Sequence, residues 1–315
     1  MKALVTGVAG FIGSHLAASL LDNGATVVGL DCFTDYYARA IKEKNLEESK
    51  LRDGFRFAEA RLQDADLPAL LDGVTHVFHL AAQAGVRKSW GKDFRVYTDN
   101  NVDATQVLLE SCAGRPLSKF VYASSSSVYG DNGSLPMRED ALPQPVSPYG
   151  VTKLAAEQLC YLYQVNHGVP AVSMRYFTVY GPRQRPDMAF HRFMKAALKD
   201  EEIALYGDGD QTRDFTFVSD AVAGTIAAGE HGVPGRVYNI GGGSRVAINH
   251  VLQIIERVAG HRLKIRREAP QKGDMRDTYA DTALARRDLG FTPKIAIEEG
   301  IQAEYRWLSS SPALV

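Results

Sequence analysis

The chain has 315 residues, of which 45% are hydrophobic and 23% are charged, and its formal net charge is -1. Such a composition is that of a globular protein with a sizeable core and, by length, about two domains. The near-zero charge excludes the strongly basic surface typical of nucleic-acid-binding proteins, so no nucleic-acid partner is expected.

The cysteines and the apolar runs restrict the environment of the protein. Cys32, Cys112 and Cys160 form no CxxC pair, and reduced thiols are typical of the cytoplasm. No apolar run approaches the roughly 20 residues that span a bilayer, so no membrane partner is expected. No histidine and cysteine cluster has zinc-ligand spacing, and no metal site is predicted.

Short apolar runs alternate with longer amphipathic segments over residues 1–176. The predicted strands are Ala3–Thr6, Thr26–Asp31, Phe55–Ala58, His76–Leu80, Lys119–Ser124 and Ala171–Tyr176. The predicted helices and one short turn are Phe11–Asn23, Tyr37–Leu51, Leu67–Leu71, Phe94–Ala113 and Pro148–His167. Several strands are apolar at nearly every position, as in a sheet covered on both faces. The alternation predicts an α/β protein of Rossmann type with a doubly wound parallel sheet.

The rhythm changes after Tyr176, where glycines and prolines separate shorter elements. Val218–Glu230 is predicted as a helix and Arg236–Ile240 as a strand that returns to the main sheet. Residues from about 245 onward are expected to form a small helical lobe. We therefore predict a first domain over residues 1–176, returning at about 215–243, and a smaller, discontinuous C-terminal substrate-binding domain within 177–315.

The first strand leads into Gly7, Gly10 and Gly13, in the order GxxGxxG, and then into a helix. Such a turn lets the N–H groups of a helix N-terminus approach a pyrophosphate. Asp31 ends the next strand, where a carboxylate accepts hydrogen bonds from ribose hydroxyls and repels a 2′-phosphate. The pattern predicts NAD rather than NADP as the cofactor.

A tyrosine and a lysine stand one helical turn apart in the segment SPYGVTK. The ammonium of Lys153 and oxidised nicotinamide both favour phenolate, and we expect them to lower the pKa of Tyr149 by roughly 2–3 units from its usual value of about 10. Tyr149 would then act as a general base, and Lys153 would also hold the nicotinamide ribose. Serines 124–127 follow a predicted strand whose end lines the ligand crevice, so some are expected to pack and one or two to bind the reacting alcohol.

With these residues in place, the chain resembles the extended short-chain dehydrogenase/reductase family, the nucleotide-sugar epimerases and dehydratases. The motifs VTGVAGFIGSHL, HLAAQAGVRKSW, SSSSVYG, SPYGVTK, YGDGDQTRDFTFVSD and YNIGGG occur in the family's order over essentially the full length. The resemblance implies a seven-stranded parallel sheet, a small nucleotide-sugar domain, tightly held NAD and a homodimer through helices at about 95–113 and 149–167. Within the family, FTDYY, AAQAGVR and RPDMAF look like UDP-glucuronate 4-epimerases.

The resemblance also implies the residues of the site. The catalytic set is Ser125, Tyr149 and Lys153. The cofactor-binding residues are Gly7, Gly10, Phe11, Ile12, Gly13, Asp31, Leu80, Ala81, Lys153 and Tyr176. The residues that bind the UDP-sugar are Ser126, Ser127, Thr178, Arg185, Phe190, Arg192, Tyr206, Gln211, Arg213 and Asp274.

Within the substrate set, the resemblance assigns the substrate carboxylate to Thr178 and Arg185. It assigns uracil and diphosphate to Phe190, Tyr206 and Arg213, with weaker candidates in Arg192, Gln211 and Asp274. Arg61 departs from the family, which usually has Asp near the adenine, and leaves the adenine contact open. Arg87 is expected either near the diphosphate or at the dimer surface.

The type of reaction follows from groups that the motifs lack. Related 4,6-dehydratases carry Asp-Glu where this chain has Ser126 and Ser127, and decarboxylating relatives carry Glu at the second position. Serine is a poor general acid or base at neutral pH, so elimination lacks its groups. We therefore predict an isomerase that interconverts UDP-glucuronate and UDP-galacturonate: C4 is oxidised with NAD, the 4-keto sugar turns, and hydride returns to its other face.

A uronate makes the 4-keto intermediate a β-keto acid, which loses carbon dioxide easily. A bidentate guanidinium, that of Arg185, is expected to hold the carboxylate in an unproductive orientation. Alternatively, Arg183 and Arg185 only neutralise the diphosphate. The competing predictions for the whole protein are a UDP-glucose 4-epimerase, a decarboxylase or 4,6-dehydratase, and a dinucleotide sensor without catalysis.

Overall fold

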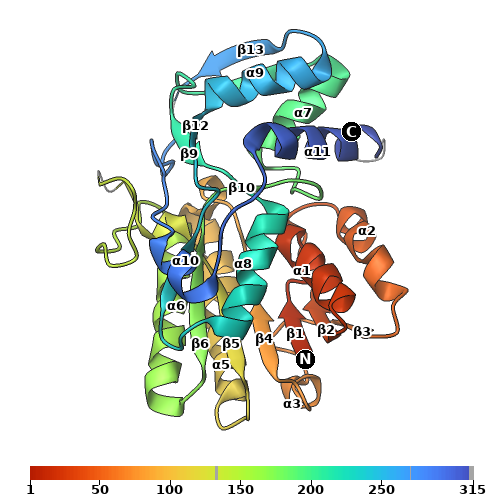
Figure 1. Cartoon of the computed structure of the whole chain (residues 1–315), viewed down its shortest axis with the longest axis vertical. Coiled ribbons are helices and arrows are strands. Elements are labelled where there is room, and N and C mark those ends of the chain that lie inside the picture. The colour runs from red at the N-terminus through yellow and green to blue at the C-terminus, as the bar shows by residue number, and fades with distance from the viewer. Residues whose placement is uncertain (132–133, 270, 312–315) are drawn as a thin grey trace.

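The computed structural model describes residues 1–131, 134–269 and 271–311. Its centre is a seven-stranded, all-parallel sheet in the order β11-β6-β5-β4-β1-β2-β3 (Figure 1). The strands are β1 (Lys2–Thr6), β2 (Thr26–Asp31), β3 (Phe55–Glu59), β4 (His76–His79), β5 (Lys119–Ser125), β6 (Ala171–Tyr176) and β11 (Val237–Ile240). The strand order reverses between β1 and β4, so the two adjacent strands lead to connections on opposite sides and open a crevice between them.

Helices cover both faces of the sheet. One face carries α1 (Phe11–Asp22), α2 (Arg39–Lys50) and α8 (Val218–His231), and the other carries α3 (Leu67–Leu70), α5 (Ala104–Cys112) and α6 (Pro148–His167). Successive residues of a strand point to opposite faces, so Leu4 enters the core under α5 and α6 while Val5 enters the core under α1 and α8. Both cores are continuous because the strands are apolar on both sides.

The smaller lobe lies above the carboxyl ends of the strands, at the top of Figure 1. It contains α7 (Ala189–Lys199), β8 (Glu202–Tyr206), α9 (Ile248–Ala259), β13 (Lys264–Glu268) and α11 (Ile297–Ser309). Phe193, Met194, Ile255 and Ile301 are among the side chains of its own apolar core. Two small ribbons, β7 (Val179–Tyr180) with β10 (Thr216–Phe217) and β9 (Thr212–Asp214) with β12 (Arg245–Ala247), connect the lobe to the sheet.

Most predicted elements are confirmed, and two differ. The return of Val237–Ile240 to the sheet beside β6 is confirmed. The predicted helix Phe94–Ala113 is instead α4 (Phe94–Tyr97), a π-helical segment (Thr98–Asp103) and then α5. The region after 245 is not all lobe, because α10 (Ala283–Leu289) packs against α8 and β11. The last four residues of the predicted second domain lie outside the described residues.

Short 3-10 turns complete the described elements, at Arg87–Ser89, Gly91–Asp93 and Ser126–Val128. The first two follow β4, and the third follows β5. All three therefore lie at the carboxyl edge of the sheet, where ligands of parallel α/β folds bind. Within the described part of the chain, we find no helix with both the length and the apolar character needed to cross a membrane.

Candidate active site

A cavity of about 660 Å³ lies between the carboxyl edge of the sheet and the lobe. Its size is within the range typical of ligand sites. With one exception, every residue that the sequence analysis assigned to catalysis, cofactor or substrate lines this cavity. Segments from β1 to the loop after β13 therefore meet in one place.

The glycine turn after β1 forms one wall of the cavity. Gly7 has a positive φ of 68°, and its N–H donates to the carbonyl of Leu30 at 2.8 Å. A Cβ on Gly13 would lie 2.2 Å from the carbonyl oxygen of Gly7, so only glycine lets α1 start this close to the turn. No side chain caps the helix at Gly10, which leaves its first N–H groups for an anion. This end of the cavity fits a dinucleotide pyrophosphate.

Asp31 lies at the end of β2 in the same cavity. Its carboxylate accepts hydrogen bonds from the N–H groups of Ala9 at 3.0 Å and Phe33 at 2.9 Å, so its position is fixed before any ribose binds. Burial raises its pKa, and these N–H groups act in the opposite direction. Lys42, a buried residue of α2 that the sequence analysis missed, interacts electrostatically with Asp31. Arg61 also lines the cavity here, where the family usually has Asp.

Tyr149 stands in the first turn of α6. The side chain of Ser147 caps this helix by accepting from the N–H of Gly150 at 3.1 Å. A Cβ on Gly150 would lie 2.5 Å from the carbonyl oxygen of Ser127, so the helix start packs directly on the serine segment. This close approach brings the phenol of Tyr149 into a hydrogen bond with Ser125.

In the protein alone, burial dominates the pKa values of both Tyr149 and Lys153. Burial raises the pKa of Tyr149, while the hydrogen bond to Ser125 and the charge of Arg185 lower it. Burial lowers the pKa of Lys153 to about 7, and its Nζ lies 4.7 Å from the centre of the Tyr122 ring. The protein's own groups therefore do not produce the lowered phenol pKa that the sequence predicted, because desolvation of both groups outweighs their charged neighbours.

The lowered pKa of Lys153 predicts a pH-dependent stability for the ligand-free protein. Between about pH 7 and 10.5 the unfolded lysine carries a proton that the folded one does not, so stability rises with pH. One such group contributes a slope of at most about 1.4 kcal/mol per pH unit. Urea denaturation of wild type and Lys153→Met across this window measures the difference. Parallel profiles for the two proteins would contradict the assignment.

All four serines, 124–127, line the cavity, and Ser124 also supports the fold. The hydroxyl of Ser124 donates to Glu157 at 2.7 Å, and Glu157 forms a buried ion pair with Arg175 at 2.6 Å. The hydrogen bond between Ser124 and Glu157 therefore joins β5 to α6. Ser125 accepts from the N–H of Ser127 at 3.1 Å, and Ser125 to Ser127 line the cavity without any carboxyl side chain among them.

A buried asparagine also supports the site. Asn101, in the π-helical segment, accepts from the N–H of Gln83 at 2.7 Å and donates to the hydroxyl of Thr152 at 2.9 Å. It thus joins the loop after β4 to the helix turn between Tyr149 and Lys153. The sequence analysis missed it, because a polar residue in a helical pattern normally indicates the solvent face.

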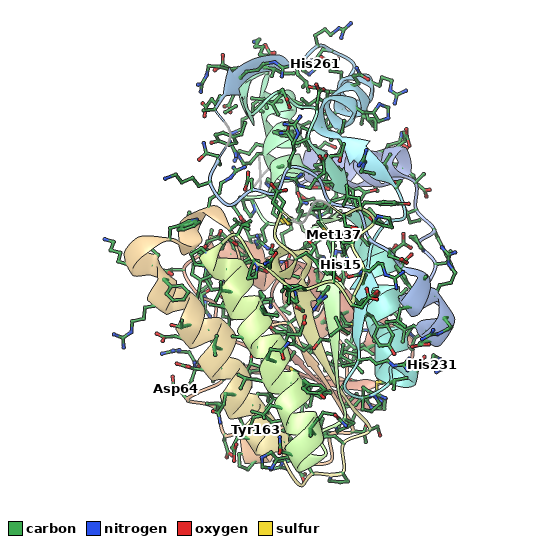
Figure 2. The ribbon with its side chains drawn as sticks, turned by 90° about the vertical axis from the view of Figure 1, so that its left-hand side faces the viewer. His15, Asp64, Met137, Tyr163, His231 and His261 are labelled. Atoms are coloured by element: carbon green, nitrogen blue, oxygen red, sulfur yellow. The ribbon has the colours of Figure 1, made fainter. Side chains whose placement is uncertain are left out.

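The loop 181–188 brings Arg185 into the cavity. Glu304 accepts from the N–H of Gly181 at 2.8 Å, and the ring of His15 hydrogen-bonds the carbonyl of Pro182 at 2.8 Å. Figure 2 labels His15 between the sheet and the lobe. Burial lowers the pKa of His15 to about 4, so the ring is neutral at pH 7 and donates to this carbonyl. The loop is therefore held from both sides.

The two arginines of this loop have different partners. Arg185 forms a two-point contact with Asp187, at 3.0 Å and 3.1 Å. Burial opposes its charge, but Asp187 outweighs burial and the pKa of the guanidinium is raised. Arg183 instead pairs with Glu48 of α2 at 3.0 Å, and it does not line the cavity. Of these two arginines, Arg185 is the one placed to meet a ligand carboxylate.

The far end of the cavity is aromatic and cationic. The ring of Tyr206 lies near two guanidinium carbons, at 4.3 Å from Arg87 and 5.9 Å from Arg192. Arg87 pairs with Asp274 at 2.6 Å, which places it in the cavity and not on a remote surface. Arg213 is half-buried here and donates to the carbonyl of Arg276 at 2.7 Å. Gln211 completes this wall by donating to the Tyr206 carbonyl at 2.7 Å.

Phe190 is the exception among the predicted residues. It is 2% exposed, its ring centre lies 4.6 Å from that of Phe215, and it does not line the cavity. The helix phase explains the difference, since α7 begins at Ala189 and turns Ala189 and Phe193 toward the cavity and Phe190 into the core. The side chain of Phe190 therefore packs in the core of the lobe, and its predicted contact with the nucleotide has no support from the cavity lining.

Comparison with known proteins identifies the family. Residues 3–241 match the NAD dependent epimerase/dehydratase family. The chain belongs to this family. It is an extended short-chain dehydrogenase/reductase, and NAD is its cofactor, in agreement with the glycine turn and Asp31 at one end of the cavity.

Three relatives of the family illustrate its range. The solved structure of UDP-glucuronic acid 4-epimerase from Bacillus cereus, with UDP-glucuronic acid and NAD, has a TM-score of 0.96 and 45% identity, covering 98% of this chain and 99% of that chain. A Thermodesulfobacterium geofontis protein named UDP-glucuronate 4-epimerase is 38% identical over 317 residues, 99% of this chain and 97% of its own. A Bacillus subtilis protein named as an uncharacterized UDP-glucose epimerase is 44% identical over 312 residues, 98% of each.

Proposed function

We propose that this protein is a UDP-glucuronate 4-epimerase, an isomerase that inverts C4 of the sugar and releases UDP-galacturonate. One observation carries the proposal. Arg185, a cation suited to a carboxylate, lines the same cavity as the hydrogen-bonded Ser125 and Tyr149. The similarity to two proteins named as UDP-glucuronate 4-epimerases supports the same substrate.

Different residues of the cavity carry out different parts of the reaction. Bound NAD supplies the hydride acceptor, and later the donor, for C4 of the sugar. Tyr149 takes the proton of the C4 hydroxyl and returns it after the sugar has turned, and Ser125 orients that hydroxyl. Thr178 and Arg185 bind the carboxylate, while Tyr206 and Arg213 hold the nucleotide so that only the sugar rotates.

The three positions Ser125, Ser126 and Ser127 carry hydroxyl side chains and no carboxyl side chain, which argues against a lyase. Elimination of water across C5–C6 needs a proton donor and an acceptor near those carbons, and a serine hydroxyl is a poor choice for either. The sensor alternative is disfavoured because a protein that only binds NAD does not need the Ser125 to Tyr149 hydrogen bond.

A UDP-glucose 4-epimerase is the second candidate, and two observations favour it. The Bacillus subtilis relative is named as an uncharacterized UDP-glucose epimerase. In addition, Asp187 already pairs with Arg185, which offsets the charge that this arginine offers to a uronate. Mixing UDP-glucose and UDP-glucuronate in one assay decides, since we expect the uronate to be converted first.

The direct test is incubation of the purified protein with UDP-glucuronate and no added cofactor, followed by proton NMR. UDP-galacturonate as the product supports the proposal. Release of carbon dioxide, or a stable 4-keto product, would assign the protein to the lyases. Conversion of UDP-glucose alone would favour the second candidate.

We also propose a homodimer that forms through α5 and α6, which run side by side across the face shown in Figure 2. Apolar side chains on the outer face of α6 are half exposed: Tyr161 at 55%, Leu162 at 49% and Val165 at 58%. Three such side chains within about one helical turn form a patch that a second copy would cover. We further propose that the chain divides into an NAD-binding domain and a nucleotide-sugar domain. We also propose a cytoplasmic location, which suits the three free thiols.

The dimer proposal predicts that Leu162→Glu yields monomers. A carboxylate placed in an apolar interface loses its hydration without gaining a partner. Sedimentation equilibrium measures the mass. The matched control is Ile265→Glu, an equally apolar, 40% exposed position on β13 of the lobe, which should leave the mass unchanged. A monomeric wild type, or a dimeric Leu162→Glu variant, would contradict the proposal.

A further inference from the structure

Arg185 is held by a partner that belongs to no part of the reaction described above. Its Nε donates to Oδ1 of Asp187 at 3.0 Å, and its Nη2 donates to Oδ2 at 3.1 Å. These contacts use one edge of the planar guanidinium. Among the described residues, Nη1 makes no hydrogen bond, so the other edge, Nη1 with the second hydrogen of Nη2, is available for a second carboxylate.

Asp187 is itself fixed from the cofactor side of the cavity. The hydroxyl of Tyr36, in the loop after β2, donates to Oδ2 of Asp187 at 3.2 Å. The same hydroxyl packs on Gly85, where a Cβ would lie 2.3 Å away and where φ is 104°. The hydroxyl of Tyr36 thus contacts both Gly85 and Asp187.

The charge of Arg185 acts on the reacting end of the cavity. It lowers the pKa of Tyr149, and Tyr149 in turn contributes to the raised pKa of Arg185. Arg185 therefore lies near enough to Tyr149 for each charge to affect the other, while its hydrogen bonds go to Asp187.

We propose that Asp187 is a positioning residue that fixes the plane of the Arg185 guanidinium, with Tyr36 as its support, and thereby sets the orientation of the substrate carboxylate. The proposal rests on the proposed function. Asp187 does not increase the affinity for the substrate carboxylate, because its charge offsets that of Arg185 and repels a second carboxylate. What it contributes is geometry, since a guanidinium held at one edge presents the other edge in a defined plane.

The two charged residues then have different roles. Arg185 attracts the uronate, and Asp187 keeps the uronate from reacting by the wrong route. In that route the C5–carboxylate bond of the 4-keto intermediate breaks, its electron pair forms the enolate of the C4 ketone, and a proton from water completes a UDP-4-keto-pentose. Carbon dioxide leaves and the cofactor stays reduced, so each bound NAD is the oxidant for one such turnover.

The test compares three variants with wild type on UDP-glucuronate. They are Asp187→Asn, Tyr36→Phe and the control Glu48→Gln, which breaks the exposed ion pair of Arg183 in the same loop. Proton NMR gives the ratio of UDP-4-keto-pentose to UDP-galacturonate, and initial rates give kcat and KM. Retained NAD and the melting temperature report on folding.

For Asp187→Asn we expect kcat for epimerisation to fall roughly 10-fold to 100-fold, the effect of a reacting group displaced by a fraction of an ångström to about 1 Å. We expect KM to stay the same or fall, and the pentose fraction to rise roughly 10-fold. Tyr36→Phe should move in the same direction by a smaller factor, and Glu48→Gln should match wild type.

Two outcomes would overturn the proposal. One is an Asp187→Asn enzyme with an unchanged product ratio and kcat. The other is a KM that rises while kcat is unchanged, which would make Asp187 a determinant of affinity. If Asp187→Asn does not fold, Tyr36→Phe decides by the same product ratio. A wild type that makes no UDP-galacturonate refutes the proposed function itself, whereas normal wild type with unaltered variants refutes this inference alone.

Discussion

Tyr149→Phe is expected to lower kcat for C4 inversion by roughly 10²-fold to 10⁴-fold, the range typical for loss of a general acid and base. The phenol of Tyr149 hydrogen-bonds Ser125 in the cavity. Phenylalanine keeps the ring contact with Tyr97, at 6.2 Å between ring centres. The variant should therefore fold and retain NAD. Initial rates with UDP-glucuronate and the absorbance spectrum of the bound cofactor measure both properties.

A matched control lies on the same helix. The hydroxyl of Tyr163 contacts Glu110 and Gln106 on α5, and it does not line the cavity (Figure 2). Tyr163→Phe removes the same hydroxyl group at a structural position, so its kcat should stay close to that of wild type. If Tyr149→Phe retained more than about a tenth of the wild-type rate, another group would have to move the proton.

Arg185→Ala should reduce kcat/KM for UDP-glucuronate by roughly 10²-fold, the equivalent of one lost charge-assisted contact to a carboxylate. It should also change the pH profile. The charge of Arg185 lowers the pKa of Tyr149, so its removal raises that pKa, and the rise of activity with pH should shift to higher pH. Measurement of kcat/KM against pH for both enzymes tests the two effects together.

Arg183→Ala is the control for Arg185→Ala. Both arginines lie in the loop 181–188, but Arg183 pairs with Glu48 outside the cavity. We expect the control to keep the wild-type profile, and both variants to keep their NAD. An Arg185→Ala enzyme with unchanged uronate kinetics would remove this residue from the binding of the carboxylate.

Much of the site is predictable because its signals are local. The turn at Gly7 to Gly13 requires glycine for steric reasons that neighbouring residues cannot alter, and it is recognisable wherever a strand precedes it. The spacing of Tyr149 and Lys153 places both on one helix face whatever the rest of the fold does. The same holds for the apolar strands, whose composition reports that both faces of the sheet are covered.

Other features depend on which surfaces meet in the folded chain. The family resemblance assigned Phe190 to the nucleotide, but the phase of α7 buries its ring beside Phe215. The π-helical turn at residues 98–103 places Asn101 between Gln83 and Thr152, two partners far away in the sequence. Neither the phase nor the partners can be obtained from a local pattern, because both are set by packing against distant segments.

The amino-acid sequence by itself determined the fold class and the nucleotide turn, because both rest on short-range sterics and periodicity, and its motifs carry the family resemblance that implied the other groups of the cavity. Only the tertiary structure decided how those groups behave. Burial raises the pKa of Tyr149 and lowers that of Lys153, and Asp187 occupies one edge of Arg185. The physical reason is that desolvation and ion pairing depend on every atom around a group, and most of those atoms come from elsewhere in the chain.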